Sequence, residues 1–361
     1  MWLAFAVLPL TLDQLHSAVA IETGMYELDE ESCLSSPQDI LSLCGCLISL
    51  SSQGQIRLAH LSVKDFLLSS EASLNKACST FSMNSTDANH ELALNCLTYL
   101  FFAELGEGPT QTSDGYANRL AHHSFLKHAA MGWTYYARAS AMAPELEALI
   151  LEFFSPKRRQ HFMSWVQVLN AIDSTFKWNL YPRHATPLYY AASFGLKSTV
   201  EQLIKDGAEL NAPGSRFGGT ALHAAVLRQH VPVMKVLLEA GADPNRVDFN
   251  RVSPLHTAVG YGDLDVIRLL LDFGALKDAV DGVGETPVVW ARKAGQIEAR
   301  DLLLGIEPKA KKRSENISPQ QVWMPTKTYF PCDFYECRSG LESSIVIKVE
   351  IGNTWTTLKK S

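Results

Sequence analysis

Long apolar runs are missing from this sequence of 361 residues. A membrane-spanning helix needs about 18 or more consecutive apolar residues. The apolar start, residues 1–8, is soon followed by Asp13, Gln14 and His16, and it lacks the basic residues that open a secretory signal. We therefore interpret it as a helix that begins a buried domain, with secretion as the alternative. The sequence predicts an intracellular protein with no membrane partner.

Positive charge is also scarce. The chain holds 32 Lys and Arg against 38 Asp and Glu, a net charge of −6. Residues 1–75 alone have a net charge of −7, because they hold nine acidic residues but only two basic ones, Arg57 and Lys64. Binding to nucleic acid requires a basic face that neutralises phosphates. Nucleic acid is therefore not an expected partner.

Cysteine is sparse and irregularly placed. The seven cysteines are an odd number with neither disulfide-framework nor zinc spacing, which predicts reduced thiols in an intracellular compartment. His122, His123 and His128 form a cluster without a carboxylate at ligand spacing, and we interpret them as solvent or core histidines. The sequence thus predicts no metal and no cofactor.

Catalytic motifs are missing as well. The chain has no Gly-x4-Gly-Lys-Ser/Thr phosphate loop, no Gly-x-Ser-x-Gly elbow and no His-Glu-x-x-His zinc helix. Gly282 and Gly284 belong to a turn rather than to a nucleotide-binding loop. We therefore expect no enzymatic activity and no small-molecule substrate, with an enzyme of unrecognised type as the alternative.

The clearest feature that the sequence does have is an internal repeat. The segments TPLYYAA, TALHAA, SPLHTA and TPVVWA begin at residues 186, 220, 253 and 286, which gives offsets of 34, 33 and 33. A second apolar stretch follows each segment and ends at Gly207, Gly241, Gly274 or Gly305. A regular interval of this size is typical of stacked helical hairpins, in which each hairpin buries its apolar face against its neighbours.

Each repeat carries the local signals of two short helices. Thr or Ser before Pro supplies a helix cap, and the glycines after each second helix suit a left-handed C-terminal turn. Gln229 replaces the glycine that ends the first helix elsewhere, so this turn is expected to differ. Asp248 and Asp281 are expected to be turn residues, and His223 and His256 to bond locally between loop and helix.

On these motifs, residues 182–305 closely resemble the ankyrin-repeat family. The resemblance implies an α-solenoid of about four repeats that binds protein partners on a concave surface formed by hairpin tips and first helices. Residues at those places face solvent, so apolar or aromatic ones there are candidates for binding, although they could instead pack on neighbouring loops. The best candidates are Phe217, Phe249 and Tyr261. The full candidate set is Phe194, Arg216, Phe217, Leu227, Arg228, Phe249, Asn250, Tyr261, Val283, Glu285 and Lys293.

Residues 1–75 show the pattern of a small winged-helix unit. Helices are expected over 11–21, capped by Thr11, over 37–43, and over 61–68 with Ser62 near the cap. Two strand-like runs, 47–50 and 55–58, flank the polar turn Ser51-Ser52-Gln53-Gly54 and predict a β-hairpin. Binding of DNA by this unit is disfavoured by its net charge of −7.

The segment IRLAHLSVKDFLLS, at residues 56–69, resembles one that recurs in fungal NACHT-type (STAND) proteins between the nucleotide-binding module and the ankyrin array. This resemblance implies a part or remnant of a nucleotide-switched receptor without its ATPase module. Alternatively, the chain is a regulatory segment that docks on a separate ATPase module. The chain begins at the winged helix, so we expect a fragment, a truncated gene model or a stand-alone remnant.

The remaining residues complete a mainly α fold. Residues 76–181 are expected to form a helical linker region with helices over 90–102, 120–137, 144–154 and 159–172 and a loop at 106–115. Residues 306–361 are expected to be a basic linker and a poorly ordered tail with a strand-like stretch at 344–350. The basic run at 308–313 could be a nuclear import signal or a solvated charge cluster. We expect a cytoplasmic protein, with a nuclear location as the alternative.

Overall fold

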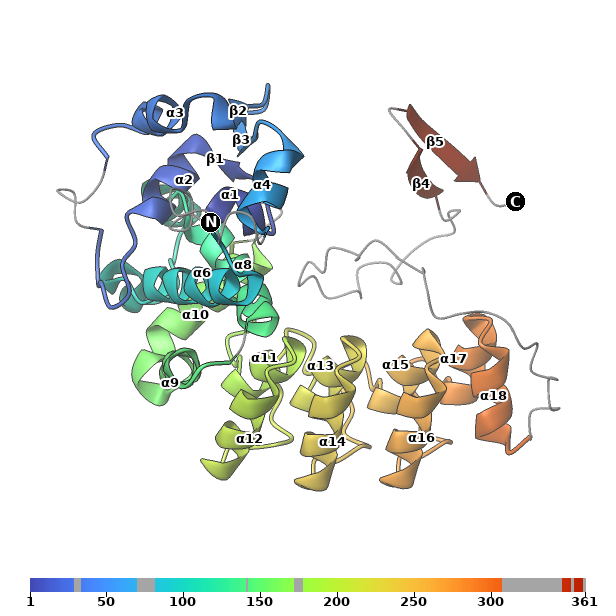
Figure 1. The fold of residues 1–361 in the computed structure, drawn as a ribbon. Helices are drawn as coiled ribbons and strands as arrows, with labels where there is room; N and C mark the ends of the chain where they lie inside the picture. The colour runs from blue at the N-terminus through green and yellow to red at the C-terminus, as the bar shows by residue number, and fades with distance from the viewer. Residues whose placement is uncertain are drawn as a thin grey trace. The chain divides into compact units, whose positions relative to one another are not determined.

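The computed structural model of this chain describes residues 1–28, 34–69, 82–140, 142–171 and 178–306, together with the backbone of 346–351 and 354–359. The described residues up to 306 belong to one compact unit, and the strands within 346–359 belong to a second one (Figure 1). None of the helices in the described part of the chain combines the length and apolar character that a bilayer crossing requires.

The N-terminal part is a set of short helices around a small antiparallel sheet. Its strands are β1 (Leu10–Thr11), β2 (Ile48–Leu50) and β3 (Gln55–Leu58), and they run in the order β1-β3-β2. β2 and β3 form the predicted hairpin, whereas sequence reasoning missed the two-residue β1. Leu10 pairs with Ile56, and both side chains are buried. The helices are α1 (Trp2–Phe5), α2 (Leu12–Val19), α3 (Gln38–Cys44), η1 (Gly45–Leu47) and α4 (Leu61–Leu67).

Two helix caps in this part test the sequence reading directly. Thr11 caps α2 as predicted, and it does so in a capping box with Gln14. Ser62 lies near the cap of α4, as predicted, and the cap itself is His60, whose Nδ1 accepts the backbone N–H of Ser62 at 3.1 Å. A histidine ring nitrogen can serve this purpose because, in the neutral tautomer, it is an acceptor.

The helical region packs α6 (Ser85–Leu100) against α8 (Leu126–Ala139), with α9 (Pro144–Phe153) and α10 (Arg159–Asn170) beside them. The predicted single helix over 120–137 is instead two helices, since α7 (Ser113–His122) ends before α8 begins. The predicted loop at 106–115 contains the end of η3 (Ala103–Glu107) and the start of α7. η4 (Pro156–Arg158) connects α9 and α10, and α6 starts five residues before its predicted start.

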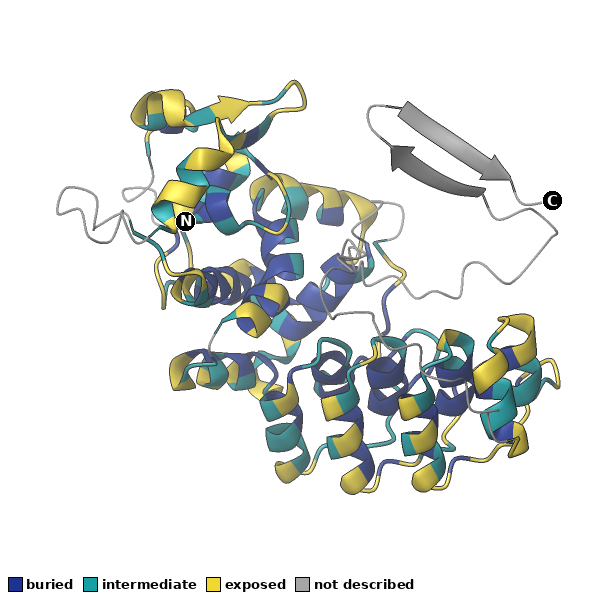
Figure 2. Ribbon diagram, turned by 45° about the vertical axis from the view of Figure 1, so that its right-hand side comes forward, coloured by how far each residue is buried: buried dark blue, intermediate teal, exposed yellow. Residues whose placement is uncertain are grey.

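Residues 187–304 form four helix pairs. The first helices are α11 (Pro187–Ser193), α13 (Ala221–Leu227), α15 (Pro254–Tyr261) and α17 (Pro287–Lys293). The second helices are α12 (Lys197–Lys205), α14 (Val231–Glu239), α16 (Leu264–Asp272) and α18 (Ile297–Leu304). First helices contact first helices along the stack, and buried residues line the contact between the two layers (Figure 2). The four predicted repeats are confirmed as an α-solenoid.

The C-terminal unit is described only in part. β4 (Val346–Ile351) and β5 (Thr354–Lys359) pair antiparallel, with Val346 opposite Lys359. β4 overlaps the strand-like stretch predicted at 344–350. The basic run at 308–313 and most of the tail predicted to be poorly ordered lie outside the described residues.

Candidate functional site

The loops that precede the first helices form the tips of the repeats. We call residues 181–185, 215–219, 248–252 and 281–285 the tip loops. In the third, the Oδ1 atom of Asp248 accepts the N–H of Asn250 at 2.9 Å and of Val252 at 2.8 Å. In the fourth, Oδ1 of Asp281 accepts the N–H of Val283 and Glu285 in the same way. Both aspartates are therefore turn residues, as predicted.

The two aspartates differ in protonation behaviour. Burial raises the pKa of Asp248, and its two backbone donors only moderate this effect. Burial also acts to raise the pKa of Asp281, but the N–H of Glu285 and the indole N–H of Trp290 outweigh it and hold that pKa below its usual value. The Trp290 indole lies 2.9 Å from Oδ2. Both carboxylates are thus committed to shaping their loops.

Adjacent tips are joined through the backbone. The N–H of Phe249 donates to the carbonyl of Phe217 at 2.8 Å, and the N–H of Gly282 donates to the carbonyl of Asn250 at 2.8 Å. The Phe249 ring lies across Gly218, where an added Cβ would stand 2.5 Å from the ring. These contacts join the second, third and fourth tips in one row.

Histidines add a second tie between repeats. Nε2 of His223 donates to the carbonyl of Val252 at 3.1 Å, and Nε2 of His256 donates to that of Glu285 at 3.0 Å. Their Nδ1 atoms accept the N–H groups of their own helix caps, so each ring must be the neutral tautomer with its proton on Nε2. Burial lowers the pKa of both histidines, to about 4 for His223. The local role predicted for these residues is confirmed, and it also reaches the next repeat.

The turn after the second repeat's first helix does not differ, so that prediction was wrong. Gln229 takes φ 58°, close to Gly262 at 76° and Gly295 at 74°. A residue with a Cβ is strained in this left-handed region. The chain keeps the turn geometry here at a cost in backbone energy.

The predicted binding residues fall into two groups. Phe249 is 67% exposed, Tyr261 44% and Val283 80%, and Asn250 and Lys293 are also exposed. Lys293 forms an ion pair with Glu285. The other members are half-buried: Phe194, Arg216, Phe217, Leu227, Arg228 and Glu285.

Phe194 lies apart from the tips. Its ring centroid is 5.7 Å from that of Trp165, so it helps to join the first repeat to the helical region. Phe217, in contrast, lies in the second tip loop beneath the guanidinium of Arg216, which is 4.7 Å from its ring centroid. Phe249 and Asn250 lie in the third tip loop and Val283 in the fourth, and backbone hydrogen bonds join these loops to the second.

Sequence reasoning missed two exposed arginines of the tip loops, Arg183 and Arg251. Arg251 takes φ 59°, at the position where the neighbouring tips have Gly218 at 79° and Gly284 at 81°. The repeat register carried the signal, since an arginine stands where the adjacent repeats have glycine.

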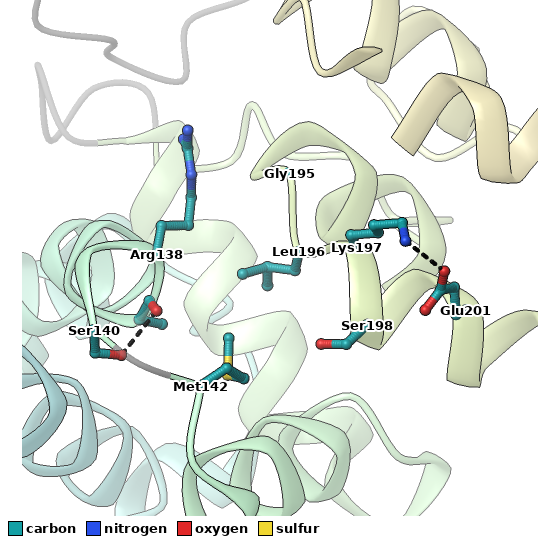
Figure 3. A pocket seen from close by; sticks show the side chains of 9 residues that line it. Arg138, Ser140, Met142, Gly195, Leu196, Lys197, Ser198 and Glu201 are labelled. Atoms are coloured by element: carbon teal, nitrogen blue, oxygen red, sulfur yellow. Dashed lines mark hydrogen bonds and ion pairs between the residues drawn. The ribbon is translucent and has the colours of Figure 1, made fainter. Parts of the chain in front are cut away.

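An open hollow of about 430 Å³ lies between the end of α8 and the start of α12 (Figure 3). Arg138, Ser140 and Met142 line one side of it and Leu196 and Lys197 the other, with the Lys197 side chain directed toward Glu201. Two of the charged residues that line it already form an ion pair, because Lys197 contacts Glu201 at 3.0 Å. The hollow therefore offers few unengaged polar groups to a ligand.

The three clustered histidines have three different partners. His122 contacts the Asn118 carbonyl, His123 contacts Glu104 at 2.6 Å, and His128 contacts the Tyr136 hydroxyl at 3.0 Å. Burial lowers the pKa of His128 to about 4. Among the described residues, no three His, Cys, Asp or Glu side chains are grouped so that they could hold a metal ion.

Known families match most of the chain in three segments. Two profiles described as ankyrin repeats match residues 164–248 and 237–288. A third, described as the winged helix domain of GPI inositol-deacylase, matches residues 1–83. The chain therefore contains ankyrin repeats behind a winged-helix domain.

Three curated proteins are among its relatives. Azaphilone pigments biosynthesis cluster protein L of Monascus ruber is 30% identical over 67% of this chain and 54% of its own length. Mouse ankyrin repeat and SOCS box protein 16 is 39% identical over 31% of this chain and 26% of its own length. Chicken inversin is 42% identical over 20% of this chain and 7% of its own length. The chain thus spans about half of the first relative and a quarter of the second. The shared repeats support a protein-interaction module.

Proposed function

We propose that the chain is a non-enzymatic binding protein that holds its partner on the tip row, meaning the tip loops and the exposed ends of the first helices. One observation carries this proposal: Phe249 is 67% exposed and Val283 80% exposed on loops that the backbone holds in fixed register. Exposed apolar side chains on a rigid surface are typical of interface anchors. Rigid loops also lose little entropy when a partner binds.

The test removes the two anchors together. Full-length chain with Phe249→Ala and Val283→Ala is compared with wild type in affinity capture from an extract of its native cells. Proteins captured by wild type should be lost from the variant, since truncating an anchor costs at least about tenfold in affinity. The matched control is Ile297→Ala and Leu304→Ala, which removes two exposed apolar side chains of α18. If capture is unchanged in the tip variant, or equally reduced in the control, this surface is not the binding site.

A second function is favoured by the winged-helix domain. Leu43 is 72% exposed and Leu61 68% exposed, and Leu47 and Leu50 are also exposed nearby in sequence on η1 and β2. Exposed apolar side chains that are grouped on a surface mark interaction sites. We propose that they cover part of a NACHT-type ATPase module, of which this chain would be a regulatory part or remnant.

Mixing experiments separate this second function from the first. The full chain and a NACHT-type ATPase fragment should form a complex, and Leu43→Ser with Leu61→Ser should weaken it. Phe249→Ala with Val283→Ala serves as the control and should leave that complex intact. If the two proteins do not associate and ATP hydrolysis is unchanged, the docking function is wrong while binding on the tip row remains.

A further inference from the structure

The tips of the first three repeats each carry an arginine. We call Arg183, Arg216 and Arg251 the arginine row. Arg183 lies 4.2 Å from the Tyr181 ring centroid and donates to Asn179, and Arg216 lies 4.7 Å above the Phe217 ring. Aromatic faces hold guanidinium groups in place without neutralising them. The row is therefore partly oriented before any partner arrives.

Acidic side chains are almost absent from the solvent-facing part of the same loops. Of the acids in the tip loops, Asp248 and Asp281 are buried and accept backbone N–H groups, and Glu285 is paired with Lys293. Within the described residues, neither Arg216 nor Arg251 has an acidic side chain within ion-pairing distance. The positive charge of these two arginines is thus left for a partner.

The acids of the repeats lie elsewhere. Residues 195–214, 229–247, 262–280 and 295–306, which contain the second helices and the loops around them, hold eleven acidic residues against seven basic ones. The tip loops and first helices, residues 181–194, 215–228, 248–261 and 281–294, hold six basic residues against three acidic ones. The stack is therefore polarised, with a basic tip row and an acidic remainder. An approaching acidic segment would be attracted to the tips and repelled from the rest, which selects both the site and its orientation.

Arg251 provides an independent observation. Its φ of 59° lies in the left-handed region, where both neighbouring tips have glycine. Strain of this kind persists only where the surrounding structure holds the residue in place, and such positions cluster at ligand-binding sites. Its backbone N–H donates to the Asp248 carbonyl at 2.9 Å, so the loop fixes the strained conformation.

From the row, the polarised stack and the strained Arg251, we infer that the tip row binds an acidic protein segment, with carboxylates on the arginine row and an apolar side chain against Phe249. This inference rests on the proposed binding function and adds the chemistry of the partner. A nucleic acid fits less well, because three arginines neutralise few phosphates and the acidic remainder of the stack repels a long polyanion.

The test is a selection of phage-displayed random peptides on the full chain. Peptides enriched on wild type should be rich in Asp and Glu around an apolar residue. Arg216→Gln with Arg251→Gln should weaken the selected peptides about tenfold, and their affinity should fall as salt rises. Lys235→Gln with Lys277→Gln removes the same charge from the same two repeats away from the tips, and it should leave the affinity unchanged.

A second variant separates binding from folding. Arg251→Gly relieves the strained backbone, so its thermal midpoint should equal or exceed that of wild type while peptide affinity falls. A fall in both the thermal midpoint and the peptide affinity, or an unchanged peptide affinity, would overturn the role of Arg251.

Other outcomes distinguish the inference from the proposed function. Neutral or basic peptides that still depend on Phe249 and Val283 would overturn the acidic partner but leave the binding surface in place. Peptides whose binding depends neither on Phe249 and Val283 nor on Arg216 and Arg251 would overturn both the acidic partner and the proposed binding surface. If oligothymidylate binds the row more tightly than any selected peptide and is lost in the arginine double variant, the partner is a nucleic acid and the inference is wrong.

Discussion

The helical region and the ankyrin stack are both built from short helices, yet they are held together differently. The centre of the helical region is an aromatic cluster in which Trp133, Trp165, Phe153 and Phe154 are fully buried and touch one another. The stack has small residues such as Ala225 and Ala258 at its centre. Its repeats are tied by hydrogen bonds that reach only the next repeat.

This difference predicts how damage spreads. In the stack these hydrogen bonds join neighbouring repeats, so the loss of one of them should stay local. In the helical region one side chain joins several helices, and its loss should be felt throughout. Trp165 extends this network into the first repeat, because its ring centroid is 5.3 Å from that of Tyr190.

The largest effect should come from Trp165→Ala. The ring of Trp165 contacts rings of α8, α9 and α11, and its indole N–H donates to the Ala130 carbonyl at 2.8 Å. Emptying this site should lower the free energy of unfolding by about 3–5 kcal/mol, measured by urea denaturation. Trp165→Phe keeps most of the ring and should cost clearly less. A loss below about 1 kcal/mol for the alanine variant would mean that the cluster is not the shared core described above.

Acid should produce the next largest effect. Burial lowers the pKa of His223 to about 4, below the value near 6.5 of an unfolded histidine. Its contribution to stability is therefore complete above about pH 6.5, is lost as the pH falls toward 4, and does not change further below that. Protonation of this one residue should lower the free energy of unfolding by about 2 kcal/mol between pH 7 and pH 5.

The variant His223→Gln checks this assignment, since glutamine does not titrate. Urea denaturation of wild type and variant at pH 7 and pH 5 should show a smaller pH dependence for the variant by that amount. Equal pH dependence in both proteins would show that protonation of other groups, such as the buried His128, controls acid unfolding.

The same contrast explains which features the sequence could predict. Repeat boundaries, helix caps, the turn role of Asp248 and the local bonds of His223 all depend on residues a few positions apart. Each therefore left a signal in its own repeat, and the regular interval multiplied that signal. Even Arg251 was readable, because the register aligns it with Gly218 and Gly284.

Other features depend on contacts that have no such signal. The break between α7 and α8 coincides with a turn in which Phe125 is buried against Trp2 and Tyr99, residues far away in the sequence. β1 has only two residues and exists because β3 lies beside it. Phe194 looked like a surface residue from its repeat position, but Trp165 partly covers it.

A smaller and local effect is expected from His256→Ala. The substitution removes the bond to the Glu285 carbonyl and leaves the buried N–H of Ser253 without its side-chain acceptor, at a cost of about 1–2 kcal/mol. Hydrogen exchange should quicken in residues 253–306 and stay unchanged in 84–171. Val289→Ala, at the same position of the fourth repeat but without this tie, is the matched control. Faster exchange throughout the helical region would contradict the nearest-neighbour description of the stack.

The smallest effect, and one of opposite sign, is expected from Gln229→Gly. Glycine adopts φ near 58° without a Cβ clash, so the variant should gain about 0.5–1 kcal/mol after the entropy that glycine adds to the unfolded chain. The reverse substitution, Gly295→Gln, is the control. Gly295 has φ 74° and open space around its Cβ position, so this variant should lose a similar amount of stability. Thermal unfolding of both variants measures the two changes. A loss in Gln229→Gly would show that the glutamine side chain stabilises its turn by more than its backbone strain costs.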